Sequence, residues 1–511
     1  MKKRTIFLII ALLIFGIFYK LHWTSGGNFI FNMDNARDMV DVREMVVLDK
    51  LRLIGPTSGV EGFFNGPGWY YLLAIPFILS KGNPYGAVVL MIVLWAIGGF
   101  FLMKLLSRYG VWVVLLGGVV WISSNYVMLA TLYSYNPNPV VLLAPLFIYL
   151  LEKYINTNSL LYGVEAWILG GLFFNFEMAF GIFIPAIFFA AIIISGKKHL
   201  FYGRYFWVGF TFFVILLLPQ ILFELRHDFF MTKSVMNYLN KGVSSGSSIL
   251  SRFDTAKNTY LGALSGTMMN WEFLSRLTVI AWILIILKFF RDRKFGKDTL
   301  LIIVMLFLII PPLFHILLPI KVMSWHLGGT MAAAIIFIAA LLGRLGNLGS
   351  LGKLISIVLS VVVVAYAVNN LEIHKNMFGK KVSLDASVFM NEISAVDYVY
   401  REAQGKNFRV YVYLPSVIDY PYQYLFWWYG QKEYGFFPKD YAYLPDKPEY
   451  IRDKEKLGGG KSPEDSGLTF LIKQPDTIGQ RHLWENSFSH LPLLNSVSVG
   501  PLIIETRQQI P

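Results

Sequence analysis

"IFLIIALLIFGIFY", residues 6–19, is an uncharged apolar run that follows Lys2, Lys3 and Arg4 after a single residue, Thr5. A basic start followed by an apolar core has the form of a secretion signal, but no small-residue cleavage site follows this one. The run therefore predicts an uncleaved signal anchor. It would form the first membrane span, with the N-terminus in the cytoplasm.

The composition extends this prediction to a polytopic membrane protein. Of 511 residues, 55% are hydrophobic and 15% are charged, against about 25% charged in soluble proteins. The sequence has no cysteine, which excludes disulfides, thiolate metal sites and cysteine nucleophiles. The net charge of +13 is assigned to cytoplasmic loops. No nucleic-acid partner is predicted, because no basic groove or recognition module accompanies the charge.

Further apolar segments recur through most of the chain, each near the ~20 residues that a bilayer core requires. They cover residues 84–103, 111–132, 139–152, 160–174, 178–195, 205–223, 273–290, 299–319, 326–343 and 352–369. With the first span, they predict about eleven transmembrane helices. The piece at 68–79 is too short for a span and is assigned to an interfacial helix on the outer side.

The basic residues of the connecting loops support this count, because cytoplasmic loops carry an excess of Lys and Arg. Alternate loops hold Lys104 and Arg108; Lys153; Lys197, Lys198 and Arg204; Lys288, Arg291, Arg293, Lys294 and Lys297; and Arg344 and Lys353. The short loops near 133–138 and 175–177 hold none. The long loops at about 21–83 and 224–272, and the C-terminal region, are therefore expected outside the cytoplasm. The expected location is the plasma membrane.

The C-terminal region has the composition of a soluble domain. Asp385 is a plausible N-cap for a helix with apolar spacing, and "FRVYVYL" (408–414), "LTFLIK" (468–473) and "SVSVGPLIIE" (496–505) are typical of strands. The predicted fold class is thus an α-helical polytopic membrane protein with a small extracytoplasmic α/β domain. The predicted domains are 1–371, which includes the first outer loop, and 372–511.

The most charged stretch of the first outer loop is "FNMDNARDMVDVREM", residues 31–45. On a helical wheel Asp34, Asp38 and Asp41 share one face, with Met39 and Val40 towards the other. This pattern predicts an amphipathic helix whose acidic face is in water. Asp34 stands apart from the other acids because it is nearest to the membrane boundary.

An acid a dozen residues beyond the first span, followed by an amphipathic helix and a series of spans, resembles the GT-C glycosyltransferases. The likeness is to the protein O-mannosyltransferase and aminoarabinose transferase branch, especially its bacterial glycosyltransferase-39-like members. It rests on "LIGPTSGVEGFFNGPGWYYLL" (53–73), "YNPNP" (135–139), "FNFEMAFG" (174–181) and "LPQILFELRHDFF" (218–230). The resemblance covers about the first 345 residues and is one of pattern.

The resemblance implies transfer of a sugar from a polyprenyl-phosphate donor to a protein, glycan or lipid acceptor on the outer face, with inversion. The family's acid in the first loop maps to Asp34, which is the predicted general base, because an attacking hydroxyl must lose its proton. The chain departs from its relatives at several positions. Asn35 replaces the second acid of an Asp-Glu pair, residues 65–67 replace Lys-Pro-Pro, and Asn136 and Asn138 replace a further acid.

The leaving lipid phosphate requires positive charge near the membrane surface. Arg37, Arg226, His227 and Lys321 fall in outer segments and are predicted to bind phosphate. Glu177, an acid in an apolar setting, is a candidate for a compensating carboxylate in the substrate site, as is Glu61. Asn136 and Asn138 are substrate-binding candidates because they stand where some relatives have an acid. For each cation, a lipid-facing interfacial role is the alternative reading. No metal ligands are predicted, and a divalent metal cofactor is left open because GT-C branches differ in this respect.

Three rival functions are weighed against a glycosyltransferase of the cell envelope. A polysaccharide polymerase or ligase would share the lipid-linked substrate and differ in acceptor. A transporter or flippase would also need many spans, but the sequence shows no inverted repeat and its charges gather in outer loops. A non-catalytic relative that binds glycan or lipid is suggested by Asn35 and Asn65.

Overall fold

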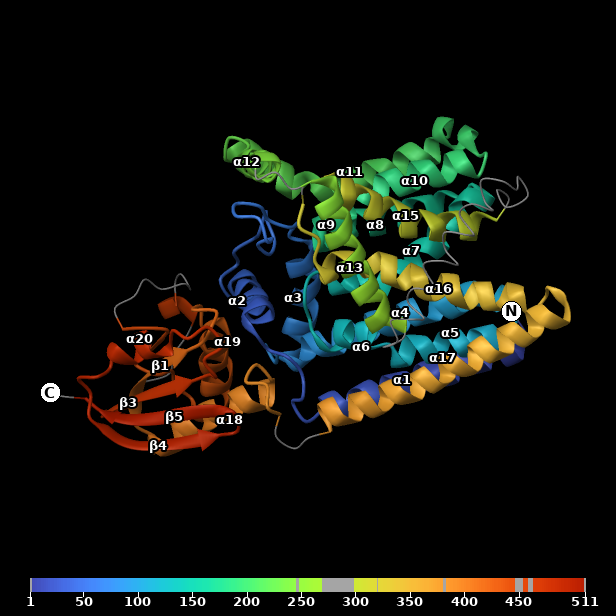
Figure 1. The fold of residues 1–511 in the computed structure, drawn as a ribbon. Coiled ribbons are helices and arrows are strands. Elements are labelled where there is room, and N and C mark those ends of the chain that lie inside the picture. Colours follow the sequence, from blue (N-terminus) through green and yellow to red (C-terminus); the bar gives the residue numbers. More distant parts are fainter. Residues whose placement is uncertain are drawn as a thin grey trace. The chain divides into compact units, whose positions relative to one another are not determined.

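A computed structural model of the protein describes residues 2–244, 248–268, 298–318, 320–379, 383–445, 454–457 and 463–509 (Figure 1). The chain divides into two compact units. The helical unit comprises Met1–Lys20, Arg52–Tyr71 and Met91–His374, and the sheet unit comprises Leu21–Leu51, Leu72–Leu90 and Lys375–Pro511. The sheet unit thus includes parts of the first loop region as well as the C-terminal region. The predicted boundary between residues 371 and 372 stays a prediction.

Helices account for most of the described chain before the sheet. In chain order they are α1 (Lys3–Thr24), α2 (Met33–Val47), α3 (Gly68–Ser80), α4 (Tyr85–Leu106), η1 (Ser107–Tyr109), α5 (Val111–Ser123), α6 (Asn125–Leu132), α7 (Asn138–Thr157), α8 (Leu160–Phe176), α9 (Met178–Gly181), α10 (Phe183–Ile194), η2 (Lys198–Tyr202), α11 (Arg204–Arg226), α12 (Phe230–Ser244), α13 (Ile249–Met268), α15 (Thr299–Leu317), η4 (Ser324–Leu327), α16 (Gly328–Leu345) and α17 (Gly349–Phe378).

The multi-pass architecture predicted from apolar segments is confirmed. Within the described ranges, seven helices are long and apolar enough to cross a membrane, and α5 with α6 makes an eighth if their 54° bend lies within one span. The predicted spans at 160–174 and 178–195 correspond to the shorter apolar helices Leu160–Phe176 and Met178–Ile194. The predicted span at 273–290 lies outside the described residues, so the count of eleven stays a prediction.

Three helices of the helical unit run in the same direction. Tyr19 and His374, near the C-terminal ends of α1 and α17, lie 3.2 Å apart between Oη and Nδ1, and the two helices lie side by side (Figure 1). Gly118 of α5 lies beside Leu12, and Lys20 Nζ lies 3.2 Å from the sulfur of Met128 in α6. The N-terminal ends of α1, α5 and α17 therefore share one end of the unit, which agrees with the predicted order of spans.

Small residues let the helices of this unit approach one another closely. A Cβ atom added at Gly98 of α4 would lie 1.7 Å from the backbone oxygen of Leu142 in α7. Next to this contact, the indole nitrogens of Trp95 and Trp121 each donate to the other residue's backbone oxygen, at 3.3 and 3.1 Å. Helix α4 is thus fixed against α5 and α7 by contacts that leave no room for a larger residue.

We expect Gly98→Ala to lower the melting temperature of the purified protein, because the added methyl group would overlap a backbone atom that cannot rotate away. Overpacking of this kind costs about 1–3 kcal/mol. The matched control is Gly262→Ala in α13, where an added Cβ meets no atom within 4 Å. Intrinsic helix propensity alone predicts unchanged or slightly higher stability for the control. Thermal unfolding in detergent followed by tryptophan fluorescence compares the two variants, and equal melting temperatures would contradict the close packing.

The sheet unit contains, among its described residues, a mixed sheet of five strands in the order β2-β1-β3-β5-β4. Its elements are α18 (Phe389–Glu402), β1 (Asn407–Tyr413), α19 (Tyr420–Leu425), the π-helical turn η5 (Phe426–Tyr434), β2 (Asp440–Ala442), η6 (Lys454–Leu457), β3 (Asp465–Lys473), α20 (Arg481–Asn486), β4 (Leu493–Val499) and β5 (Leu502–Gln508). Strands β2, β1 and β3 pair in parallel, and β5 pairs antiparallel to both β3 and β4. The predicted small α/β domain is confirmed.

Two local predictions for this unit need correction. Helix α18 begins at Phe389 with Val388 as its N-cap, whereas the Asp385 carboxylate accepts hydrogen bonds from the backbone and hydroxyl of Ser387 at 2.9 and 2.7 Å. Asp385 therefore stabilises the turn before the helix rather than the helix itself. The stretch 496–505 contains parts of two strands, β4 and β5, because Gly500 has a φ of +57° and reverses the chain.

The aromatic segment around residues 424–428 packs inside the sheet unit. The Tyr424 hydroxyl donates to the backbone oxygen of Gly82 at 2.6 Å, and the Trp428 indole donates to that of Lys81 at 3.1 Å. Gly82 has a φ of +80°, which its lack of a Cβ atom allows. These rings are thus used to hold the turn between α3 and α4.

Candidate functional site

Asp34 is the second residue of α2 and lies in its first turn, two positions after the N-cap Asn32. The Asn32 side chain accepts a hydrogen bond from the backbone N–H of Asp34 at 3.0 Å, which fixes the start of the helix. A negative charge is favourable in this turn because of the helix dipole. The Asp34 side chain is 32% exposed, so its carboxylate is held by the helix and is still accessible to an incoming molecule.

Arg37 joins Asp34 to a second, fully buried carboxylate. One of its terminal nitrogens, Nη1, lies 3.3 Å from Asp34 Oδ1. Its Nε and Nη2 donate to Asp38 Oδ1 at 3.1 and 2.9 Å. Asp38 has no exposed surface, and Arg37 is 9% exposed. The predicted role of Arg37 in phosphate binding stays a prediction, but its guanidinium already contacts two carboxylates.

The acidic face of α2 is only partly in water, contrary to the prediction, because Asp34 and Asp41 are partly exposed whereas Asp38 is fully buried. Asp38, Arg43 and Glu44 are 0%, 1% and 7% exposed, and α2 packs against α19 within the sheet unit. The Arg43 guanidinium lies over the Trp427 ring, 5.0 Å from its centroid. Helical periodicity groups Asp34, Asp38 and Asp41 on one face, but it does not show that Arg37 pairs with Asp38 or that Arg43 lies over an aromatic ring.

Asn35 has a structural use that explains an amide at this position. Its Nδ2 donates to the backbone oxygen of Ile30 at 2.6 Å, and the residue is 1% exposed. A carboxylate in its place could not donate this bond. The Asn35 amide therefore holds the segment before α2 against the start of the helix.

Glu177 occupies the break between α8 and α9 in the helical unit. Its φ and ψ of −148° and 96° are extended, so α8 ends there, and its Oε1 accepts from the backbone N–H of Ala179 at 3.3 Å, which caps α9. The residue is 6% exposed. Burial raises the pKa of its carboxyl to about 8, and the hydrogen bond from Ala179 opposes this only in part. The carboxyl group is therefore mostly protonated near neutral pH.

Asparagine side chains hold the backbone on both sides of Glu177. Asn136 Nδ2 donates to the backbone oxygen of Phe176 at 2.7 Å, and Asn65 Oδ1 accepts from the N–H of Met178 at 3.0 Å. Two of the sequence candidates, Glu177 and Asn136, are thus brought together. Asn138 instead donates to the backbone oxygen of Tyr133 at 2.8 Å and closes the turn before α7.

The buried carboxyl of Glu177 should make stability depend on pH. Because its pKa is higher in the folded protein than the ordinary value of 4.5, its contribution to stability is lost as the pH rises from about 4.5 to about 8. We expect Glu177→Gln to remove this loss and to melt about 5 °C or more above the wild type at pH 8.5. Melting curves from pH 5 to 9 measure this. Glu61→Gln is the matched control because Glu61 is exposed, and a wild-type curve parallel to that of Glu177→Gln would contradict the prediction.

Arg226 and His227 lie at the C-terminal end of α11, and both are exposed. His227 Nδ1 lies 2.8 Å from the backbone oxygen of Phe223, and its ring stacks on the Phe223 ring at 4.1 Å. The neighbouring Glu224 accepts from the backbone N–H groups of Met231 and Thr232 and from the Thr232 hydroxyl, at 2.8, 3.0 and 2.5 Å. Glu224 thus fixes the turn into α12, and the two predicted phosphate ligands, Arg226 and His227, are exposed beside this turn.

The loop of residues 52–67 connects the end of α11 to the break at Glu177. Gln220 of α11 donates to the backbone oxygen of Phe64 at 3.3 Å, and the rings of Phe64 and Phe223 meet edge to face at 6.0 Å. The next residue, Asn65, contacts Met178 as described. The structure therefore joins the neighbourhoods of Arg226, His227 and Glu177 through one short loop.

Lys321 is exposed in the segment before η4, and the structure links it to none of the other candidates by a hydrogen bond. Within the described residues, no group of three or more His, Asp or Glu side chains could hold a metal ion. Among the described residues, the candidates are thus carboxyl groups, amides and cations, with Asp34 and Arg37 in the sheet unit and the others in the helical unit.

Asn65 and Asn175 are site-building residues that sequence reasoning missed as such. Asn175 Oδ1 accepts from the N–H of Gly68 at 3.1 Å, and its Nδ2 donates to the backbone oxygens of Gly171 and Leu216 at 3.0 and 3.1 Å. An added Cβ at Gly66 would lie 2.2 Å from the same Oδ1. One sequence feature could have identified Asn175, namely its place two residues before Glu177 in an apolar run. An amide buried among apolar residues must find hydrogen-bond partners.

Comparison with known proteins supports the fold. No family model matches the sequence, and no curated protein matches it. The crystal structure of ArnT from Cupriavidus metallidurans bound to undecaprenyl phosphate is similar, with a TM-score of 0.61 at 12% sequence identity. The match covers 99% of this chain and 98% of that one. It extends beyond the part of the sequence that carried the resemblance and includes the C-terminal region. The chain therefore shares its fold with that membrane-protein structure over almost the whole of both chains.

Proposed function

We propose that this protein is an inverting membrane glycosyltransferase that moves a sugar from a polyprenyl-phosphate donor to an acceptor on the outer face of the membrane. The observation that carries the proposal is the fold likeness over almost the whole of both chains to a protein crystallised with undecaprenyl phosphate. A carboxylate in the first outer segment, as the GT-C resemblance implies, supports it.

Asp34 is the proposed general base. It is held in a helix turn with a third of its side chain exposed, and a carboxylate within hydrogen-bond reach of an acceptor hydroxyl can take its proton during attack. The lipid phosphate leaves as a stable anion, so the reaction needs positive charge at the leaving group rather than an acid. Because the reaction needs one base and no acid, a single accessible carboxylate at Asp34 is sufficient, and the amide at Asn35 is compatible with this mechanism.

Arg226, His227 and Lys321 are the proposed sources of charge for the phosphate, because each is exposed. Arg37 is a weaker choice, since Asp34 and Asp38 already neutralise it. We propose that Glu177 acts as an uncharged carboxyl group in the substrate site. A protonated carboxyl can donate a hydrogen bond to an anionic or hydroxylated substrate without repelling it.

The proposal is tested with purified protein in proteoliposomes supplied with radiolabelled polyprenyl-phosphate sugars and candidate acceptors. Transfer of label to an acceptor, with inversion at the anomeric carbon, is the expected result. Transfer onto a growing lipid-linked glycan would instead identify a polymerase or ligase. Movement of intact donor across sealed vesicles without transfer would identify a flippase. Donor binding with neither outcome would identify a non-catalytic binder.

A further inference from the structure

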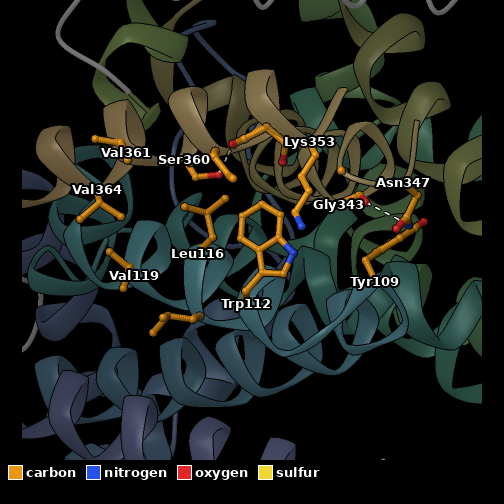
Figure 2. Close-up of a pocket in the computed structure, with 14 residues that line it drawn as sticks. Tyr109, Trp112, Leu116, Val119, Gly343, Asn347, Lys353, Ser360, Val361 and Val364 are labelled. Atoms are coloured by element: carbon orange, nitrogen blue, oxygen red, sulfur yellow. Dashed lines mark hydrogen bonds between the residues drawn. The ribbon is translucent and has the colours of Figure 1, made fainter. Parts of the chain in front are cut away.

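A pocket of about 610 Å³ opens among η1, α5, α16 and α17, and all of its lining residues belong to the helical unit (Figure 2). This volume is within the ~300–1,000 Å³ that ligand pockets usually have. None of the residues proposed for sugar transfer lines it. It is therefore separate from the candidate site.

The two ends of the pocket differ in chemistry. Figure 2 shows Tyr109 and Asn347 at one end and Val119, Val361 and Val364 at the other, with Lys353 directed inwards beside the Trp112 indole. Val361 and Val364 of α17 are 63% and 46% exposed. In a membrane helix such exposed valines face lipid chains, so the apolar end is open to the bilayer.

Lys353 differs from the other cations near the pocket. Arg108 pairs with Glu152 at 2.5 Å, and Arg344 pairs with Asp298. Lys353 is exposed and forms no ion pair with any residue that the structure describes. An uncompensated ammonium group beside a lipid-facing cavity favours an anion that the membrane itself supplies.

The position along the helices puts this cation at a membrane surface. Lys353 lies in the second turn of α17, at the end of the unit where α1 and α5 also begin. Lys2, Lys3 and Arg4 lie at that end of α1. Trp112 and Tyr109 beside it are side chains typical of the interface between headgroups and hydrocarbon. The polar end of the pocket is thus at headgroup depth and its apolar end at acyl-chain depth.

We infer that this pocket binds one anionic phospholipid from the leaflet on the side of the N-terminus. The headgroup phosphate would contact the Lys353 ammonium and accept hydrogen bonds from Asn347 or Tyr109, and one acyl chain would lie along Val119, Val361 and Val364. The positive charge of Lys353 favours an anionic headgroup. The apolar end of the cavity favours a lipid with an acyl chain over a free phosphate ion. The inference does not depend on the proposed sugar transfer.

The test compares lipid retention by native mass spectrometry after exchange into detergent with phosphatidylglycerol or phosphatidylcholine. Wild type should retain phosphatidylglycerol, and Lys353→Gln should weaken its affinity about tenfold, the effect of losing one charged hydrogen-bond partner. Lys353→Arg should restore binding, because it keeps the charge. Lys198→Gln, an exposed cation of η2 outside the pocket, is the matched control and should bind as wild type does.

A variant that fills the cavity provides the second arm. Ser360→Trp should abolish retention while Lys353 remains in place, and an unchanged melting temperature would show that it folds. Three results would overturn the inference: equal retention by wild type and Lys353→Gln, equal affinity for phosphatidylcholine, or preferential retention of undecaprenyl phosphate sensitive to Ser360→Trp.

Discussion

Asp34→Asn should reduce the turnover of sugar transfer by about 10²- to 10⁴-fold, the usual contribution of a general base. The substitution keeps the shape of the side chain and its place in the first turn of α2, but the amide cannot accept a proton from an attacking hydroxyl. The Michaelis constant for the donor should change little, because Asp34 is assigned no role in holding the lipid phosphate. A loss in turnover with donor affinity kept would separate a chemical role from a binding role.

Asp41→Asn is the matched control for this experiment. It removes one negative charge from the same helix and leaves Asp34, Arg37 and Asp38 in place, so any effect of net charge or helix stability appears in both variants. Asp34→Glu should retain part of the activity with the carboxylate displaced by one methylene group. Equal turnover by wild type and Asp34→Asn, measured with radiolabelled donor, would remove Asp34 as the base while leaving the proposed transferase activity intact.

The membrane architecture could be predicted from the sequence because one rule dominates it. A span must satisfy its backbone within a helix and needs about 20 apolar residues, and this signal is local. The apolar run at residues 6–19 and several later ones correspond to the described apolar helices. The bend at Ser124 was not, since the cap formed by its hydroxyl on the N–H of Val127 at 3.3 Å leaves the apolar pattern unchanged.

The surroundings of the charged helix could not be predicted, because its partners are distant in sequence. Periodicity placed Asp38 on one face with Asp34 and Asp41, but it could not reveal that α2 would pack against α19 or that Arg43 would lie over the Trp427 ring. The same limit applies to Glu177. The free-energy cost of a carboxyl group in an apolar setting made Glu177 a candidate. Its surroundings could not be predicted, because Asn65, which accepts a hydrogen bond from the next residue Met178, is 113 residues away in the sequence. The sequence identifies a polar group that is unfavourable to bury, but only the fold shows which residues contact it.

Asp38→Ala should be among the most destabilising substitutions in the protein. It removes the fully buried carboxylate that accepts two hydrogen bonds from Arg37, and leaves a guanidinium that is 9% exposed with less compensation. Breaking a buried ion pair from one side costs about 3–5 kcal/mol. We expect a clear fall in the melting temperature and in the denaturant midpoint, measured on the purified protein in detergent.

Replacing both partners distinguishes the cost of an orphaned charge from the value of the pair. Arg37→Met with Asp38→Leu removes both charges while filling similar volume, and such replacements are often neutral or stabilising. The double variant should therefore be more stable than Asp38→Ala. If it is as unstable as the single variant, the pair itself holds α2 in place. If Asp38→Ala melts as wild type does, Arg37 is satisfied by other groups and the ion pair does not organise the start of the helix that carries Asp34.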